Sequence, residues 1–229
     1  MASNQYFGTL ASTQTADTNR VLRNTYALLG LSMIPTAIGA FLGTLYAVPF
    51  MMGSPILSLL LFIGVSWGLM FAVQANRNSG LGVVLLLAFT FFMGVMLGPL
   101  LSVALHYRNG GQLIALAAGG TGVIFFTLAG IAATTKRDFS NMGKLLFVGL
   151  ILLLVASIAN AFLHIPALAL AVSGVGVLLF SGFILYDINR IVHGGETSYV
   201  SATLSVYLDI YNLFTSLLQL LMAFAGDRD

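Results

Sequence analysis

The chain has 229 residues, of which 59% are hydrophobic and 7% are charged, and it contains no cysteine. Because a soluble domain carries about 25% charged residues, this composition predicts a membrane protein. It excludes a disulfide-bonded secreted domain, a nucleic-acid-binding protein and a thiol enzyme. The formal net charge is only +2, so the positions of the charges are more informative than their sum.

Long charge-free runs predict the number of membrane spans. The main runs contain 53 residues after Arg23, 30 after Arg77, 27 after Arg108 and 42 after Lys144. A helix needs about 20 apolar residues to cross the hydrocarbon core. The first and last of these runs therefore hold two spans each, and the other two hold one each. We expect prolines to divide the long runs, in the first case within residues 49–55.

The last uncharged run, Ile210 to Gly226, has only 17 residues. We therefore expect the seventh helix to begin near Ala202 and to carry Asp209 into the membrane. The predicted spans cover residues 25–46, 55–75, 81–105, 112–134, 145–163, 167–188 and 202–225.

The basic residues predict the orientation of these seven helices. An N-terminus in the cytoplasm leaves only Arg108 and Arg228 outside. Seven basic residues then lie inside, namely Arg20, Arg23, Arg77, Lys136, Arg137, Lys144 and Arg190. This bias predicts a cytoplasmic N-terminus and an external C-terminus.

The domain organisation is expected to be simple. Residues 1–24 are rich in Ser, Thr, Asn and Gln and contain no apolar stretch of signal-peptide length. We interpret them as a flexible cytoplasmic tail, with a protein-binding tail as the alternative. Residues 25–229 form one all-α transmembrane domain.

Small residues at a spacing of four occur in three predicted spans, at Gly39–Gly43, Gly64–Gly68 and Gly94–Gly98. In lipid this spacing lets neighbouring helix backbones approach closely. The contacts can lie within the chain, at a dimer face or along a pathway. Pro35 and Pro99 fall inside spans one and three and are expected to kink them.

A polar stripe follows one face of the last span, at spacings of 4, 3, 4 and 3 residues. It contains Ser205, Asp209, Asn212, Ser216 and Gln219. Lipid offers these groups no hydrogen bonds. They either join helices to one another or line a polar path.

Two aspartates lie in the last two spans, Asp187 at the end of span six and Asp209 about two turns into span seven. These consecutive antiparallel helices can bring the two carboxyl groups to a similar depth, facing each other. Two ionised carboxylates in contact would repel, and sharing one proton relieves that repulsion. Such a pair is a proton-dependent latch, and when deprotonated it either repels or recruits a cation, calcium among them.

Two other interpretations of the aspartates compete with the latch. Asp187 can pair with Arg190 three residues on, while Asp209 bonds a neighbouring helix. An intramembrane aspartyl protease also uses two membrane aspartates, but its second motif is Gly-x-Gly-Asp, whereas residues 206–209 read Val-Tyr-Leu-Asp.

The histidines do not indicate a metal centre. His106, His164 and His193 fall near predicted loops on two sides of the membrane. The chain has no zinc-protease motif and no phosphate-binding loop motif. We therefore expect neither an enzyme nor a bound cofactor.

Four motifs resemble one known family. Leu185-Tyr186-Asp187 and residues 207–214, Tyr-Leu-Asp-Ile-Tyr-Asn-Leu-Phe, are similar to the transmembrane Bax inhibitor motif family. Residues 21–26, Val-Leu-Arg-Asn-Thr-Tyr, and 193–197, His-Gly-Gly-Glu-Thr, resemble its bacterial YccA-type branch. The resemblance runs from about residue 20 to the end of the chain.

The resemblance implies seven helices with the last one central, in a multi-pass protein of the bacterial inner membrane. It implies a pH-sensitive calcium leak latched by Asp187 and Asp209, with Arg77 as a partner of the pair. It also implies association with the membrane-anchored ATP-dependent protease FtsH, as substrate and modulator, with the N-terminal tail giving the protease its grip. Protease modulation and cation leak are thus two expected functions, and the oligomeric state stays open.

Overall fold

The computed structural model describes residues 2–135 and 137–226, with all their side chains except those of residues 2–17, Met52 and Pro55. Seven helices in this part of the chain are long and apolar enough to cross a membrane. They are α1 (Ala2–Leu42), α3 (Pro55–Ala75), α4 (Gly80–Leu105), α5 (Gly110–Thr134), α6 (Met142–Leu163), α7 (Pro166–Val192) and α8 (Tyr199–Gly226). The seven predicted spans are confirmed, and several ends shift by a few residues.

The first span is longer than predicted. After α1 the chain continues through a π-helical turn, η1 (Gly43–Ala47), and a short helix, α2 (Val48–Gly53). The predicted break within residues 49–55 is wrong in extent, because the chain leaves helical geometry only at Ser54. Pro49 lies in the first turn of α2, where a missing N–H is tolerated.

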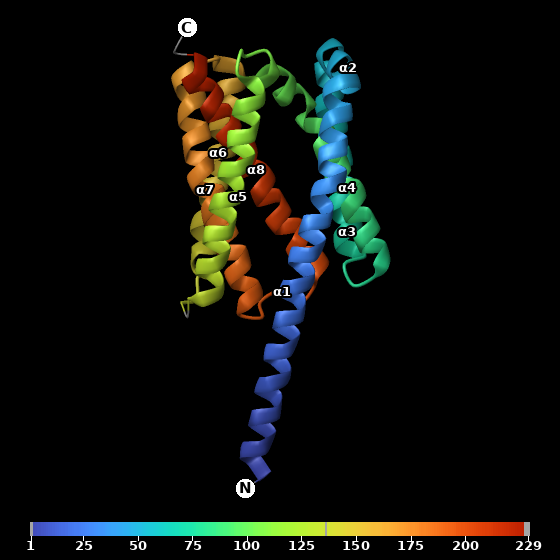
Figure 1. Ribbon diagram of the computed structural model, residues 1–229, viewed down its shortest axis with the longest axis vertical. Coiled ribbons are helices and arrows are strands. Elements are labelled where there is room, and N and C mark those ends of the chain that lie inside the picture. Colours follow the sequence, from blue (N-terminus) through green and yellow to red (C-terminus); the bar gives the residue numbers. More distant parts are fainter. Residues whose placement is uncertain (1, 136, 227–229) are drawn as a thin grey trace.

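The helices form two groups with α8 between them. Figure 1 shows α1, α3 and α4 on one side and α5, α6 and α7 on the other, with α8 running obliquely through the middle. The last helix packs against α1, α3, α4, α5 and α7. It is therefore central, as the resemblance implies, whereas α6 packs only against α7 among the described elements.

Two of the three glycine pairs close the contact between α1 and α4. A Cβ atom added at Gly39 would overlap the carbonyl oxygen of Phe91, and one added at Gly94 would overlap that of Thr36. Packing within the chain is thus confirmed for Gly39–Gly43 and Gly94–Gly98. By contrast, Gly64–Gly68 on α3 has no neighbouring atom within 4 Å of either added Cβ.

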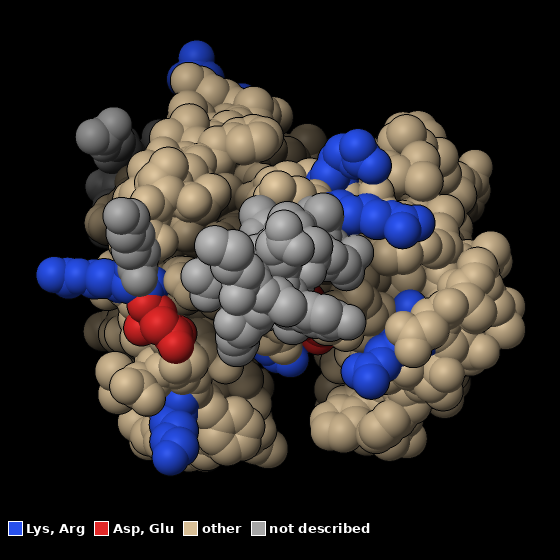
Figure 2. All heavy atoms as spheres, turned by 90° about the horizontal axis from the view of Figure 1, so that it is seen from below, with Lys and Arg blue, Asp and Glu red and all other residues tan. Residues whose placement is uncertain are grey.

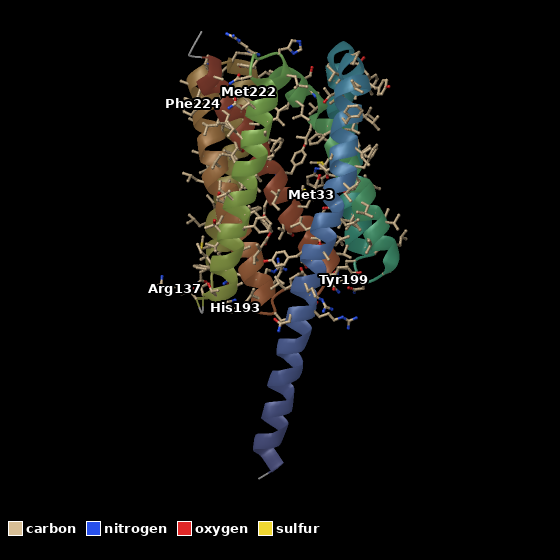
Figure 3. All side chains as sticks on the ribbon, viewed as in Figure 1. Met33, Arg137, His193, Tyr199, Met222 and Phe224 are labelled. Carbon is tan, nitrogen blue, oxygen red and sulfur yellow. The ribbon has the colours of Figure 1, made fainter. Side chains whose placement is uncertain are left out.

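The two ends of the molecule carry different parts of the chain. Arg137, His193 and Tyr199 lie at the end from which α1 projects, and Met222 and Phe224 lie at the opposite end (Figure 3). Along its N-terminal part α1 extends beyond the other helices (Figure 1). This helix includes the predicted tail, whose flexibility stays a prediction.

Candidate functional site

The two aspartates come together between α7 and α8. Asp209 is 7% exposed and Asp187 is half-buried. Their carboxyl groups lie within hydrogen-bonding reach of each other. The antiparallel hairpin of α7 and α8 produces this contact, because both residues lie on the helix faces that meet.

The chemistry of this contact follows from the hydrogen bonds that a carboxyl group can donate and accept. An ionised carboxylate only accepts hydrogen bonds, so a bond between two carboxyl groups requires a proton on one of them. Asp209 Oδ2 is buried and has no hydrogen-bond partner among the described residues. The pair can therefore hold one proton in a site with few competing donors.

The charged groups beside this pair lie in the last turn of α7 and in the α7–α8 connection. Arg190 donates to Glu196 at 3.3 Å and to the carbonyl oxygen of Gly195 at 3.2 Å. That ion pair is the one found in the described part of the chain. The alternative in which Arg190 pairs with Asp187 is therefore wrong for this structure. The carboxyl group of Asp187 lies beside that of Asp209 instead.

A small void lies between Asp187 and this connection. Its volume is about 10 Å³, and its walls include Asp187, Arg190, Glu196 and Ser205. This is near the lower limit, about 10–15 Å³, for a cavity that can hold one water molecule.

Arg77 lies near this region but not at the carboxyl groups. Its side chain is exposed, and its carbonyl oxygen accepts a hydrogen bond from Ser198 Oγ at 2.9 Å. One turn later, Ser201 Oγ donates to Gln74 Oε1 at 2.8 Å. These bonds tie the end of α3 and the α3–α4 loop to the start of α8, while the predicted role of Arg77 as a latch partner stays a prediction.

Members of the polar stripe on α8 face α7 in this structure. Ser205 lines the small void beside Asp187. Ser173 Oγ on α7 lies 3.4 Å from Gln219 Oε1. Ser216 is the first neighbour of a Cβ added at Gly176 of α7.

Asn212, the remaining member of the stripe, donates to the carbonyl oxygen of Leu208 in its own helix at 2.8 Å. The stripe therefore joins helices in this conformation. Its role as the wall of a polar path stays a prediction.

One structural residue near the site escaped the sequence analysis. Asn189 on α7 is 1% exposed; it accepts from the amide of Phe139 and donates to the carbonyl oxygen of Arg137, both at 3.0 Å. It fastens the α5–α6 loop to α7. The available signal in the sequence was an amide side chain two residues after Asp187, at the end of an apolar span.

A second missed residue, Tyr207, joins α8 to the other group of helices. It is 1% exposed, and its hydroxyl lies 3.0 Å from Thr36 Oγ1 on α1 and 3.3 Å from the carbonyl oxygen of Thr90 on α4. Its ring packs edge-on against Phe89, with centroids 6.1 Å apart. Tyr207 falls outside the polar stripe, so the stripe pattern did not identify it.

A metal ion would find only part of a coordination shell here. Calcium takes six to eight oxygen ligands, and among the described residues no group of three or more His, Cys, Asp or Glu side chains comes together. Asp187 and Asp209 could supply carboxylate oxygens, with the remaining ligands coming from water. Their predicted calcium contact stays a prediction.

Comparison with known proteins shows which proteins this chain is similar to. A family model described as inhibitor of apoptosis-promoting Bax1 matches residues 18–226. The protein described as modulator of FtsH protease YccA from Escherichia coli K12 is 43% identical over 209 residues, which cover 91% of this chain and 92% of that protein.

Two further relatives are described as membrane proteins. The inner membrane protein YccA of a second Escherichia coli strain is 43% identical over 91% of this chain and 92% of its own length. A membrane protein of Vibrio cholerae is 43% identical over 91% of each chain. With its seven apolar helices, this chain is a multi-pass inner-membrane protein.

Proposed function

This chain belongs to the Bax inhibitor-1 family, and on that premise we propose that it modulates a membrane-anchored ATP-dependent protease of the FtsH type. The 43% identity to the Escherichia coli modulator, over nearly the whole of both chains, carries the proposal. None of the relatives described above is named as an enzyme. The protein acts by binding rather than by catalysis.

The proposed orientation puts α1's projecting end in the cytoplasm and the end of α8 in the periplasm. Figure 2 looks onto that projecting end and shows Lys and Arg side chains spread around its rim, the arrangement typical of a cytoplasmic face. A reporter fused after Asp229 should behave as periplasmic. A cytoplasmic signal from this fusion would contradict the orientation.

The N-terminal segment is the proposed grip for the protease. Figure 1 shows α1 projecting past the bundle on this side. Deleting residues 1–18 should leave the seven-helix domain folded. The shortened protein should persist longer in cells and still co-purify with FtsH, because the grip would be lost while the membrane contact remains.

The test is a native pull-down of FtsH from membranes, paired with a pulse-chase measurement of turnover. Absence of FtsH from the full-length sample would overturn the proposal. Unchanged turnover after the deletion would remove the tail from the mechanism.

A second candidate activity is a pH-gated cation leak, and the contact between Asp187 and Asp209 favours it. With a shared proton the pair ties α7 to α8. Loss of that proton as pH rises leaves two negative charges in contact, and their repulsion should separate the helices. Opening should therefore occur as pH rises.

Calcium flux into liposomes across a range of external pH tests this activity. Asp187→Asn and Asp209→Asn should each abolish the pH-dependent step. Asp138→Asn is the matched control: this exposed loop carboxylate accepts from the Ser140 amide, which lowers the pKa of Asp138, so it stays ionised throughout. A path that opens on acidification would contradict the mechanism.

A further inference from the structure

A cavity of about 840 Å³ lies at the end of the molecule where α8 ends. Its walls come from the α4–α5 connection, the first turns of α5 and the last turns of α8. Figure 3 shows Met222 and Phe224 at this end, opposite the end from which α1 projects. The volume is in the range of ligand pockets, about 300–1,000 Å³, so the cavity is large enough for an occupant.

The wall that faces the helix ends is polar. The whole α4–α5 connection lines it, and α5 adds one amide, so that it comprises His106, Tyr107, Arg108, Asn109 and Gln112. In the described part of the chain these side chains make one hydrogen bond, in which His106 Nδ1 lies 2.6 Å from the carbonyl oxygen of Ser102. The guanidinium of Arg108 and the amides have N–H donors to spare. The wall therefore suits a negatively charged acceptor, and a guanidinium binds phosphate through paired N–H donors.

The other wall is apolar and lies deeper along the helices. It includes Leu116 of α5 and Leu221 and Phe224 of α8. Leu116 is six residues after Gly110, the first residue of α5, which is about 9 Å along the helix axis. Leu116 is 53% exposed and Phe224 is 55% exposed. The cavity is therefore open on this side to the hydrocarbon around the helices.

The acidic side chains that the structure describes do not line this cavity. They are Asp138, Asp187, Glu196 and Asp209. Two further carboxylates, Asp227 and Asp229, follow Gly226 in the sequence with Arg228 between them, and all three lie outside the described residues. Residues 227–229 are therefore the competing occupant for Arg108.

We propose that this cavity binds an anionic phospholipid from the leaflet at this end, with its phosphate held by Arg108 and the start of one acyl chain on Leu116 and Phe224. A phospholipid presents a charged group and then hydrocarbon, in the order of the two walls. An inorganic anion would use only the polar wall, and a wholly apolar molecule would use only the other. In the orientation proposed above, the lipid belongs to the periplasmic leaflet.

The bound lipid would connect the two groups of helices. The α4–α5 connection crosses from one group to the other at this end (Figure 1), and the last turns of α8 complete the cavity. A molecule that contacts all three walls binds the folded state and not the unfolded chain. It should therefore raise the melting temperature of the protein.

The experiment measures lipid retained by the full-length protein in native mass spectrometry, with palmitoyl-oleoyl phosphatidylglycerol as the probe. Dihexanoyl phosphatidylglycerol supplies the headgroup without long chains, palmitoyl-oleoyl phosphatidylcholine supplies the chains without net charge, and inorganic phosphate supplies the ion alone. Ala225→Phe fills the cavity from α8, and Ala223→Phe is its matched control, because Ala223 is exposed two residues earlier and lies outside the lining. Arg108→Gln removes the charge, with Arg23→Gln on α1 as its control.

One long-chain phosphatidylglycerol should stay bound to the parent and to Ala223→Phe, and Ala225→Phe should lower its retention about tenfold. Arg108→Gln should remove the preference for phosphatidylglycerol over phosphatidylcholine, whereas Arg23→Gln should keep it. The long-chain lipid should raise the melting temperature of the parent and leave that of Ala225→Phe unchanged. Circular dichroism and a single elution peak confirm that each variant is folded.

Three results would overturn the proposal. The first is equal retention by Ala225→Phe and Ala223→Phe. The second is equal retention of the dihexanoyl lipid, or binding of inorganic phosphate in place of the lipid. The third is lipid binding that appears only when Asp227 and Asp229 are both replaced with asparagine, because residues 227–229 would then be the occupant in the parent.

Discussion

Helix α1 has two flanks, and glycine has opposite consequences on them. Toward α4, Gly39 and Gly94 bring the backbones into direct contact, so that an added Cβ atom would overlap a carbonyl oxygen. Toward α5, Gly30 and Gly122 face open space. Small residues therefore close one interface and keep another open. The difference lies in what stands opposite each glycine, because the residue type is the same.

The difference matters because the solvent is lipid. Lipid tails are as apolar as the side chains, so helices associate through close packing and hydrogen bonds. The contact between α1 and α4 has close packing. Between α1 and α5 the rings of Tyr26 and Phe125 pack edge-on, with centroids 6.2 Å apart, but the two backbones do not come close in the described part of the chain. A third interface, between α7 and α8, is closed by polar groups.

The largest effect should come from breaking the glycine contact. Gly94→Leu would place its side chain against the backbone of Thr36 and Ala40, which cannot move aside as a flexible side chain can. We expect a loss of about 3 kcal/mol or more of unfolding free energy. Thermal unfolding in detergent measures it, and Gly122→Leu is the matched control. Equal melting temperatures for the two variants would contradict the distinction between the flanks.

The polar interface should respond to pH instead. A folded state that holds a shared proton binds more protons than the unfolded chain near neutral pH, so stability should fall as pH rises. Asp187→Asn and Asp209→Asn should each flatten this slope. The double variant should add little to either single one, because the two groups act as a unit.

Unfolding followed at several pH values tests this coupling. Roughly additive effects, with a pH slope left in each single variant, would show that the aspartates are independent. Asp209 would then act as a hydrogen-bonding group between helices and nothing more.

How far the sequence could predict these interfaces depends on the range of the interaction. The spans followed from uninterrupted apolar runs, a local property, and the contact between Asp187 and Asp209 followed from one hairpin. The spacing of glycines did not distinguish Gly94–Gly98, which meets a backbone, from Gly64–Gly68, which meets nothing. The separation of the α1 and α5 backbones depends on tertiary packing, which no local pattern encodes.

A smaller effect is expected where α7 holds the α5–α6 loop. Asn189→Ala removes both hydrogen bonds to that loop and leaves the partly buried amide of Phe139 without its acceptor. We expect a cost of about 1–3 kcal/mol and faster hydrogen exchange at the Phe139 amide. Asn160→Ala, which removes an exposed bond to the Ile165 amide, is the control. Equal exchange in Asn189→Ala and the parent would show that other contacts hold the loop.

The smallest effect should come from the third glycine pair, Gly64–Gly68. It tests whether glycines that face open space can be replaced without loss of stability. Gly64 and Gly68 are exposed on α3 and have nothing within 4 Å of an added Cβ. Replacing both with alanine removes no contact within the chain, and alanine favours the helix by less than about 1 kcal/mol per residue. The melting temperature should stay the same or rise slightly. The mass measured by light scattering in detergent should also be unchanged, because nothing in the chain makes these glycines an interface. A lower mass in the double variant would instead show that Gly64–Gly68 forms a contact between two copies of the chain. These glycines would then be needed for close approach of two helices, as the glycines between α1 and α4 are.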